Sequence, residues 1–146
     1  MTMLDESLVR RTMRTRLKTV SVLPDALAWE GRTFQPPTLE DAAGPLLWVA
    51  EQQVILSEVL AASCTLEAIG ETAYLVFTPE WRGTEAADTL CKAIAEAFEP
   101  VQSLTATGLS IILERVERRP FRGDDRHPAW IFKAVAIRWR SFTSTS

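Results

Sequence analysis

The residues best suited to chemistry lie in one charged stretch near the C-terminus. His127 is the only histidine of the chain, and Asp124 and Asp125 come shortly before it. Two carboxylates and an imidazole can bind a divalent metal, but these three lack the spacing of a recognised metal site. The pattern favours a solvated loop, with a metal site as the alternative. Any mechanism that needs a histidine would have to use His127.

Other signatures of catalysis are missing from the sequence. The six glycines form neither a Gly-x-Gly-x-x-Gly nor a phosphate-loop motif, and no Gly-x-Ser-x-Gly nucleophile elbow occurs. Glu40 and Asp41 are adjacent, so they do not make a catalytic pair of carboxylates by themselves. Cys64 and Cys91 form no Cys-x-x-Cys motif, and we expect Cys91 in the core. We therefore expect no enzymatic activity, no bound metal and no cofactor.

Two loops instead carry the residue types that anchor protein interfaces. They contain Trp81 and Arg82 in one case, and Arg118, Arg119, Phe121 and Arg122 in the other. Aromatic and arginine side chains supply buried area and directed hydrogen bonds. We expect both loops to make intermolecular contacts and to lie at different ends of a sheet. For Trp81, packing onto the core is an equal alternative.

The clearest element that could position these loops is a helix between Glu80 and Pro100. Its apolar residues recur at every fourth position, at Ala86, Leu90, Ile94 and Phe98. This spacing places an apolar stripe on one face, which we expect to pack across a sheet. Thr84 is the expected N-cap residue, since its hydroxyl can accept a hydrogen bond from a free amide of the first turn. Pro100 ends the helix because it lacks an amide hydrogen.

The other segments predict a first helix and a set of strands. The helix covers residues 3–20, and strands are predicted over 27–34, 45–60, 66–78, 109–117 and 129–140, with a short strand or turn over 104–108. The apolar runs within 45–60 favour a strand that is covered on both faces. Residues 61–65 would join the two long strands as a hairpin. The last six residues are expected to fray.

These elements predict an α+β fold. We expect a mostly antiparallel sheet, with an N-terminal helix and a central amphipathic helix packed on it, mainly on one face. The chain has 146 residues, which fits a single domain over residues 1–146. Its formal net charge is -3, which argues against a general nucleic-acid-binding surface. No apolar run is long enough to span a bilayer, and no signal pattern opens the chain, so a cytoplasmic protein is expected.

The features of residues 10–140 also follow one another in a familiar order. They are Arg16-Leu17 in the first helix, Trp29 to Phe34-x-Pro36-Pro37, a central helix ending in Phe98, a strand opened by Leu104-Thr-Ala-Thr-Gly-Leu, and a last strand opened by Trp130. This order resembles the tail terminator (tail-completion) proteins of long-tailed phages and gene transfer agents. It is a resemblance of pattern and order, and the 38–45 and 118–127 loops have no counterpart in it.

The resemblance implies a homo-oligomeric ring, commonly a hexamer, that caps the head-proximal end of a tail tube. Such a ring stops tube polymerisation and provides the junction to the neck or head. The implied partners are other copies of the chain, the major tail tube protein and a neck or head-completion protein. DNA would pass through the lumen without specific binding, which a negative net charge suits. The implied location is the tail of a virion, after assembly in the host cytoplasm.

A function of another class also fits the sequence. A small α+β ligand-binding or regulatory domain would use a pocket beneath the central helix. Such a domain predicts a monomer or dimer that gains thermal stability with a ligand, whereas the first hypothesis predicts a discrete ring. An enzyme is the third hypothesis, and the scarcity of candidate catalytic groups makes it the weakest. Under the first hypothesis, the Trp81 and Arg118–Arg122 loops would carry subunit or tail-tube contacts.

Overall fold

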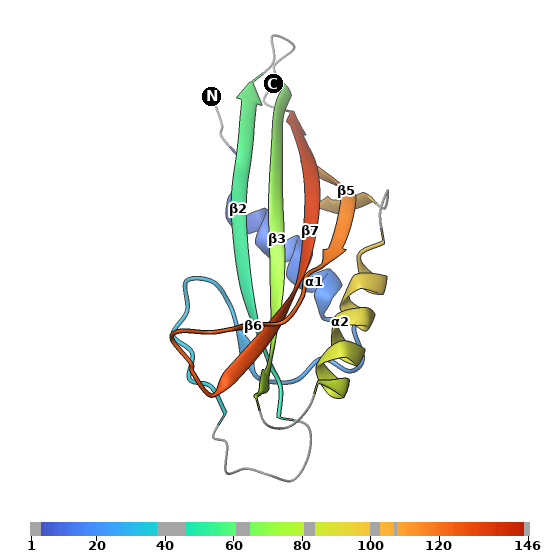
Figure 1. Cartoon of the computed structure of the whole chain (residues 1–146). Coiled ribbons are helices and arrows are strands. Elements are labelled where there is room, and N and C mark those ends of the chain that lie inside the picture. The colour runs from blue at the N-terminus through green and yellow to red at the C-terminus, as the bar shows by residue number, and fades with distance from the viewer. Residues whose placement is uncertain are drawn as a thin grey trace.

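The computed structural model describes residues 4–37, 46–60, 65–80, 84–99, 103–106 and 108–144. Within these residues, two helices pack on a curved seven-stranded sheet (Figure 1). The elements are α1 (Glu6–Leu17), β1 (Leu27–Ala28), β2 (Trp48–Leu60), β3 (Thr65–Pro79), α2 (Glu85–Ala97), β4 (Ser103–Ala106), β5 (Leu109–Arg118), β6 (Arg122–Gly123) and β7 (Trp130–Ser144). Neither helix is long and apolar enough to cross a membrane.

The sheet is mixed rather than purely antiparallel. Its strand order is β1-β2-β3-β7-β5-β4, with β6 paired to β7. All pairs are antiparallel except β1 and β2, which run parallel where Leu27 faces Val49. The strand predicted over 27–34 shrinks to two residues. Gly31 explains part of this difference, because its φ of 82° lies in the left-handed region and turns the chain out of an extended path.

Two long antiparallel pairs form the centre of the sheet. β2 pairs with β3 from Trp48↔Phe77 to Leu60↔Leu66, as the predicted hairpin requires; residues 61–64 lie outside the described part. β7 pairs with β3 on one side and with β5 on the other, up to Thr143. The prediction that the last six residues fray is therefore wrong for residues 141–144, because backbone partners flank them.

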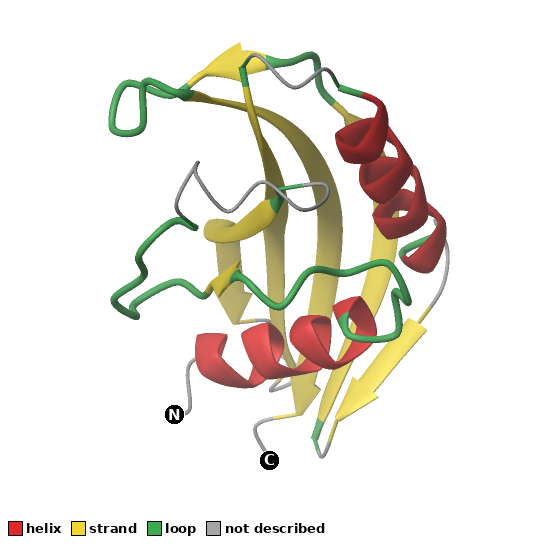
Figure 2. Cartoon of the chain, turned by 90° about the horizontal axis from the view of Figure 1, so that it is seen from below, coloured by secondary structure: helices red, strands yellow, loops and turns green. Residues whose placement is uncertain are grey.

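Both helices cover the same face of the sheet (Figure 2). The core beneath them is built from α1 (Val9, Met13 and Leu17), α2 (Ala87, Leu90, Cys91 and Ile94), Phe98, β3 (Leu66, Ala68, Tyr74 and Val76), β5 (Leu109, Ile111 and Leu113) and β7 (Val135, Ile137 and Trp139). Leu90, Ile94 and Phe98 are at most 1% exposed, which confirms that the predicted stripe faces the sheet. Burial of each such side chain contributes about 1.5–3 kcal/mol to folding.

The ends of α2 differ in part from the prediction. Thr84 occupies the N-cap position, but its side chain makes no capping hydrogen bond. Its φ and ψ of -111° and -3° are closer to helical than to extended backbone, whereas a capping side chain normally belongs to an extended residue. Asp88 in the first turn instead accepts a hydrogen bond of 3.0 Å from Lys133 Nζ of β7. This ion pair ties α2 to the middle of the sheet.

A second, smaller core lies on the opposite face, at one end of the sheet. It contains Trp48, Ala73, Leu75, Phe77, Trp130, Ala134 and Ala136. The rings of Trp48 and Phe77 stack with 3.7 Å between centroids, and Phe34 packs against Trp48 at 5.0 Å. The alternation of β3 side chains between the two cores confirms the predicted faces of this strand.

Two contacts on the helix-covered face hold α1 on β2 and the Trp139 ring on β3. Arg14 of α1 donates from Nε to Glu51 Oε2 at 2.8 Å, and the side chain of Glu51 is fully buried in β2. In β3, Gly70 lies against the Trp139 ring, so a Cβ at this position would be only 2.3 Å from Cζ2. The Trp139 indole N–H donates to Thr72 Oγ1 at 3.0 Å, which holds the ring in place.

Candidate interaction surface

The arginine-rich segment predicted to be a loop is partly a strand. Arg118 ends β5 opposite Val135, and the amide of Arg119 donates to Ala134 O at 2.9 Å. Arg122 begins β6 opposite Phe132. The segment therefore runs along the first part of β7 and closes that end of the sheet. The side chains of Arg118 and Arg122 are exposed, as an interface would require.

Arg119 is already paired within the chain. Its Nη2 lies 2.6 Å from Glu71 Oε1 and 3.7 Å from Glu117 Oε2. The side chain of Arg119 is 38% exposed, so these pairs contribute at most about 1 kcal/mol to stability. A partner that binds Arg119 would have to share it with Glu71 or displace Glu71.

Phe121 contributes to the subunit's own packing. Its half-buried ring contacts the core on the helix-covered face, and Lys133 Nζ lies 5.4 Å from the ring centroid. The same Lys133 binds Asp88 of α2. Phe121 therefore helps to hold α2, β7 and the arginine-rich segment together, in addition to any intermolecular contact it makes.

The strands that lead into the two predicted interface loops end at the same end of the sheet. Trp81 and Arg82 themselves fall outside the described residues. The strand before them, β3, ends at Pro79 opposite Trp130, and Glu80 N donates to Ala129 O at 3.1 Å. Because Arg122 also pairs near this end of β7, Glu80 and the arginine-rich segment lie at one end of the sheet, whereas we expected the two loops at different ends. The physical reason is that β3 and β5 both run antiparallel to β7, so the segments that follow them begin at the same end of the sheet.

His127 packs on the aromatic rings of the second core. Its Nδ1 lies 2.6 Å from Asp124 Oδ2, and its ring meets Trp48 edge-on at 5.2 Å and Phe77 at 6.3 Å. Across the described ranges, no three His, Cys, Asp or Glu residues gather into a group that could hold a metal ion. His127 is thus half-buried and packed, whereas the predicted solvated loop would leave it free. Glu40 and Asp41 lie outside the described residues.

Cys91 is buried on the inner face of α2, as predicted. Burial raises the pKa of its thiol to about 11, although Lys133 nearby opposes this shift. The thiolate is the reactive form of cysteine, so Cys91 is poorly suited to nucleophilic chemistry near neutral pH. Tyr74 lies in the same core, and its pKa is also raised well above the ordinary value, chiefly by burial.

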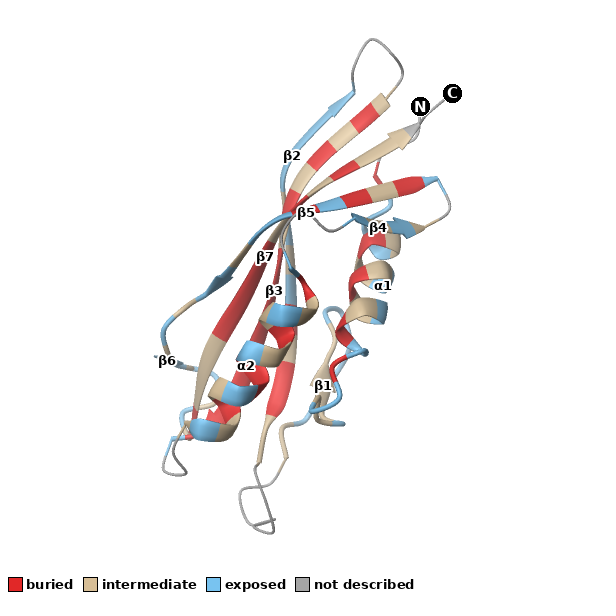
Figure 3. Ribbon diagram, turned by 90° about the vertical axis from the view of Figure 1, so that its right-hand side faces the viewer, coloured by how far each residue is buried: buried red, intermediate tan, exposed pale blue. Residues whose placement is uncertain are grey.

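The structure reveals an apolar surface on β2 that the sequence did not predict. Four large apolar side chains of residues 54–60 are 41–55% exposed: Val54, Leu56, Val59 and Leu60. The prediction that this strand is covered on both faces is therefore wrong beyond Glu51 (Figure 3). We call residues 54–60 the β2 arm. The available signal was the glutamates of the partner strand, since Val54 lies opposite Glu71 and Val59 opposite Glu67, and neither glutamate provides an apolar cover.

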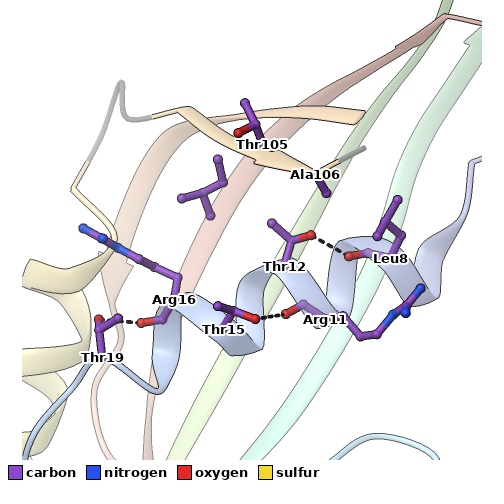
Figure 4. Close-up of a pocket in the computed structure, with 9 residues that line it drawn as sticks. Leu8, Arg11, Thr12, Thr15, Arg16, Thr19, Thr105 and Ala106 are labelled. Carbon is purple, nitrogen blue, oxygen red and sulfur yellow. Dashed lines mark hydrogen bonds between the residues drawn. The ribbon is translucent and has the colours of Figure 1, made fainter. Parts of the chain in front are cut away.

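A groove lies between α1 and β4, at the other edge of the sheet. It has a volume of about 400 Å³. Figure 4 shows the residues that line it: Leu8, Arg11, Thr12, Thr15, Arg16 and Thr19 of α1 and the following turn, and Leu104, Thr105 and Ala106 of β4. Thr12, Thr15 and Thr19 donate their hydroxyls to carbonyls of α1 itself, at 2.7–2.9 Å. Their methyl groups therefore provide much of the surface available to a partner.

Comparison with known proteins supports the fold. No family model matches the chain, and no curated protein matches it in sequence. Among solved structures, a chain of the virion of a native gene transfer agent particle is similar, with a TM-score of 0.61, 15% identity, and coverage of 92% of this chain and 94% of that chain. A second solved protein, without a functional description, has a TM-score of 0.65, 19% identity, and coverage of 94% and 96%. At these identities the likeness establishes a shared fold over almost the whole chain.

Proposed function

We propose that this chain is a structural virion protein that forms a ring at the head-proximal end of a tail tube. The ring stops tube polymerisation and provides the junction to the neck or head. The observation that carries the proposal is the fold shared with a gene transfer agent virion chain, which covers more than nine-tenths of both chains. The order of sequence features over residues 10–140 points to the same class of protein.

The charges on the face of the sheet that the helices leave uncovered agree with a lumen that lets DNA pass. Arg140 lies 2.7 Å from both Glu67 and Glu114, and Arg119 lies 2.6 Å from Glu71. These arginines are neutralised by at least one carboxylate each, so they offer little net positive charge to phosphates. Because phosphate neutralisation drives non-specific DNA binding, such a face would hold DNA weakly.

The end of the sheet that carries Arg118 and Arg122 is the proposed contact to the tail tube. Both side chains are exposed, and the Trp81 loop begins from the same end at Glu80. Capping requires that one face of the ring match the tube and that the other face lack the site for the next tube ring. Glu80 and the arginine-rich segment would then belong to the tube-facing side of the ring, and the opposite side would contact the neck or head.

The ligand-binding alternative receives less support. It requires a pocket beneath α2, but Leu90, Cys91 and Ile94 on the inner face of α2 are at most 1% exposed. Side chains of the sheet, including Tyr74, fill the space beneath this helix. We further propose that the chain is not an enzyme, since His127 is engaged with Asp124 and Trp48 and Cys91 is buried.

The proposal is tested by adding the purified chain to growing tubes of the tail tube protein from the same particle. Electron microscopy should show shorter tubes with a ring at one end, and native mass spectrometry should show a discrete oligomer. The double variant Arg118→Glu/Arg122→Glu should form the ring and cap poorly. Unchanged tube lengths with the wild-type chain, and no density at the tube ends, would contradict the proposed function.

A further inference from the structure

The β2 arm is an unprotected strand edge. The outer edge of β2 is covered at its start, where Val49 N donates to Ala26 O and Gln53 N to Glu30 Oε2. Among the described residues, no strand pairs with this edge from residue 54 to residue 60. Free edges are commonly blunted by lysine or proline, and the β2 arm contains neither. Its backbone and apolar side chains are therefore both available to a partner.

β4 provides a second free edge at the opposite side of the sheet. In the described part of the chain it pairs only with β5, so its outer edge faces away from the sheet. The α1–β4 groove lies beside this edge, on the helix-covered side. On the other side of the sheet, Ile112 of β5 is 36% exposed and faces Ser103 across the β4–β5 pair. An added strand beside β4 would have apolar surface near both of its faces.

We propose that the β2 arm of one copy lies along the outer edge of β4 of a second copy, with its helix-side residues, Leu60 and Glu58, in the α1–β4 groove. This inference rests on the proposed function, because it specifies how the ring closes. The contact joins two different patches of the same chain, so it is head-to-tail and propagates from subunit to subunit. A strand added to a free edge gains backbone hydrogen bonds, while alternate side chains provide specificity.

The side chains of the arm match the two faces of this site. Leu60 pairs with Leu66, and Glu58 pairs with Ala68, and both of these partners face the helix-covered core. If the sheet continues between copies, Leu60 and Glu58 of one copy face α1 of the next. Val59 points to the opposite side, where Ile112 of the next copy is exposed.

Charge supports the same pairing. The β2 arm contains Glu58 and no lysine or arginine, whereas α1 contains four arginines, of which Arg10 and Arg14 already pair with glutamates of their own chain. Arg11 lines the groove and is exposed. Glu58 Oε1 accepts a hydrogen bond from the amide of Leu4, and its exposed carboxylate can also receive the guanidinium of a neighbour's Arg11.

Two variants separate the halves of the contact. Leu60→Asp puts a charge on the arm, and Thr15→Trp fills the groove. Matched controls are Val22→Asp, at an apolar residue that is 51% exposed elsewhere, and Thr89→Trp in α2, where the hydroxyl also donates to a carbonyl one turn earlier. Native mass spectrometry should show monomers for the first two variants and wild-type oligomers for both controls. Circular dichroism should show that all four variants are folded.

Mixing the two monomeric variants gives the decisive result. A head-to-tail contact predicts one heterodimer, formed by the intact arm of the Thr15→Trp chain and the intact groove of the Leu60→Asp chain, and no larger species. Oligomers of wild-type size in either single variant, a monomeric wild-type chain, or a mixture that stays monomeric would each overturn the proposed contact. Assembled rings that fail to cap tubes would instead contradict the proposed function and leave this contact intact.

Discussion

β2 and β3 run side by side for almost their whole lengths, yet β3 is covered along its length and most of β2 is exposed. β3 lies between β2 and β7 and is buried or half-buried from Thr65 to Pro79. β2 is buried only near its start, and its last five residues are all exposed. The difference teaches that apolar residues serve two purposes in this sheet. Those of β3 stabilise the subunit, whereas the four exposed apolar residues of the β2 arm contribute little to its fold and are available to a partner.

The largest expected loss of stability comes from a substitution in the core between the helices and β3. Phe98 is fully buried, and its ring lies 5.7 Å from that of Tyr74. Phe98→Ala should lower the free energy of unfolding by about 3–5 kcal/mol, through lost burial and the cavity left behind. Urea denaturation measures this loss, with the exposed Val22→Ala as control. A loss below about 1 kcal/mol would mean that the inner face of α2 is not packed as described.

A single methyl group tests the middle of β3. Gly70→Ala would place a Cβ 2.3 Å from the Trp139 ring, which is held by its hydrogen bond to Thr72. The ring or the strand must shift, so we expect a loss of about 1–3 kcal/mol in thermal or urea unfolding. Trp139→Phe in the Gly70→Ala background should recover part of that loss. If Gly70→Ala lowered the stability of the Trp139→Phe chain as much as that of the wild-type chain, the Trp139 ring would be excluded as the cause.

Alkaline pH should also destabilise this core. Burial raises the pKa of Cys91 from 9.0 to about 11, and it raises the pKa of Tyr74. Between about pH 9 and pH 11 the unfolded chain loses protons that the folded chain keeps, so stability falls as pH rises through this window. The Cys91 contribution is at most about 2–3 kcal/mol. Cys91→Ala should flatten the pH dependence of the urea midpoint; an unchanged slope would contradict the assignment.

The arginine-rich segment should separate assembly from stability. Arg119→Glu would face Glu71 and Glu117, so we expect it to cost about 1 kcal/mol. Arg122→Glu, at an exposed residue, should cost less than about 0.5 kcal/mol. Both variants should form the ring but weaken tube capping, measured as tail length in electron micrographs. Normal particles at normal yield would show that these arginines do not form the proposed contact.

The sequence predicted the parts of the fold that local spacing determines. The four-residue spacing from Leu90 to Phe98 predicted the inner face of α2, and the alternation within β3 predicted its two faces. It could not predict which strands form edges, because this depends on pairing between distant segments. The apolar run of β2 therefore suggested burial, although β1, over its two residues, is the one strand that pairs with its outer edge in the described part of the chain.

The candidate site was harder to predict for the same reason. Residue type singled out Phe121 and Arg119, but the structure engages both within the subunit. The β2 arm and the α1–β4 groove are built from ordinary leucine, valine and threonine residues. They become a candidate site only through exposure and through the two free edges of the sheet.

A matched pair of substitutions tests the comparison between β2 and β3 most directly. Leu60 and Leu66 are cross-strand partners, but Leu60 is 41% exposed and Leu66 is 1% exposed. In the Thr15→Trp background, where the proposed self-association is blocked, Leu66→Ala should cost about 2–5 kcal/mol and Leu60→Ala less than about 1 kcal/mol. Urea midpoints measure both changes with the same probe. In the wild-type background, Leu60→Ala should also lower the stability gained at higher protein concentration, since binding to another copy stabilises the folded state. Equal costs for Leu60 and Leu66 in the blocked background would place the β2 arm inside the subunit's own core, and the distinction between the two strands would be lost.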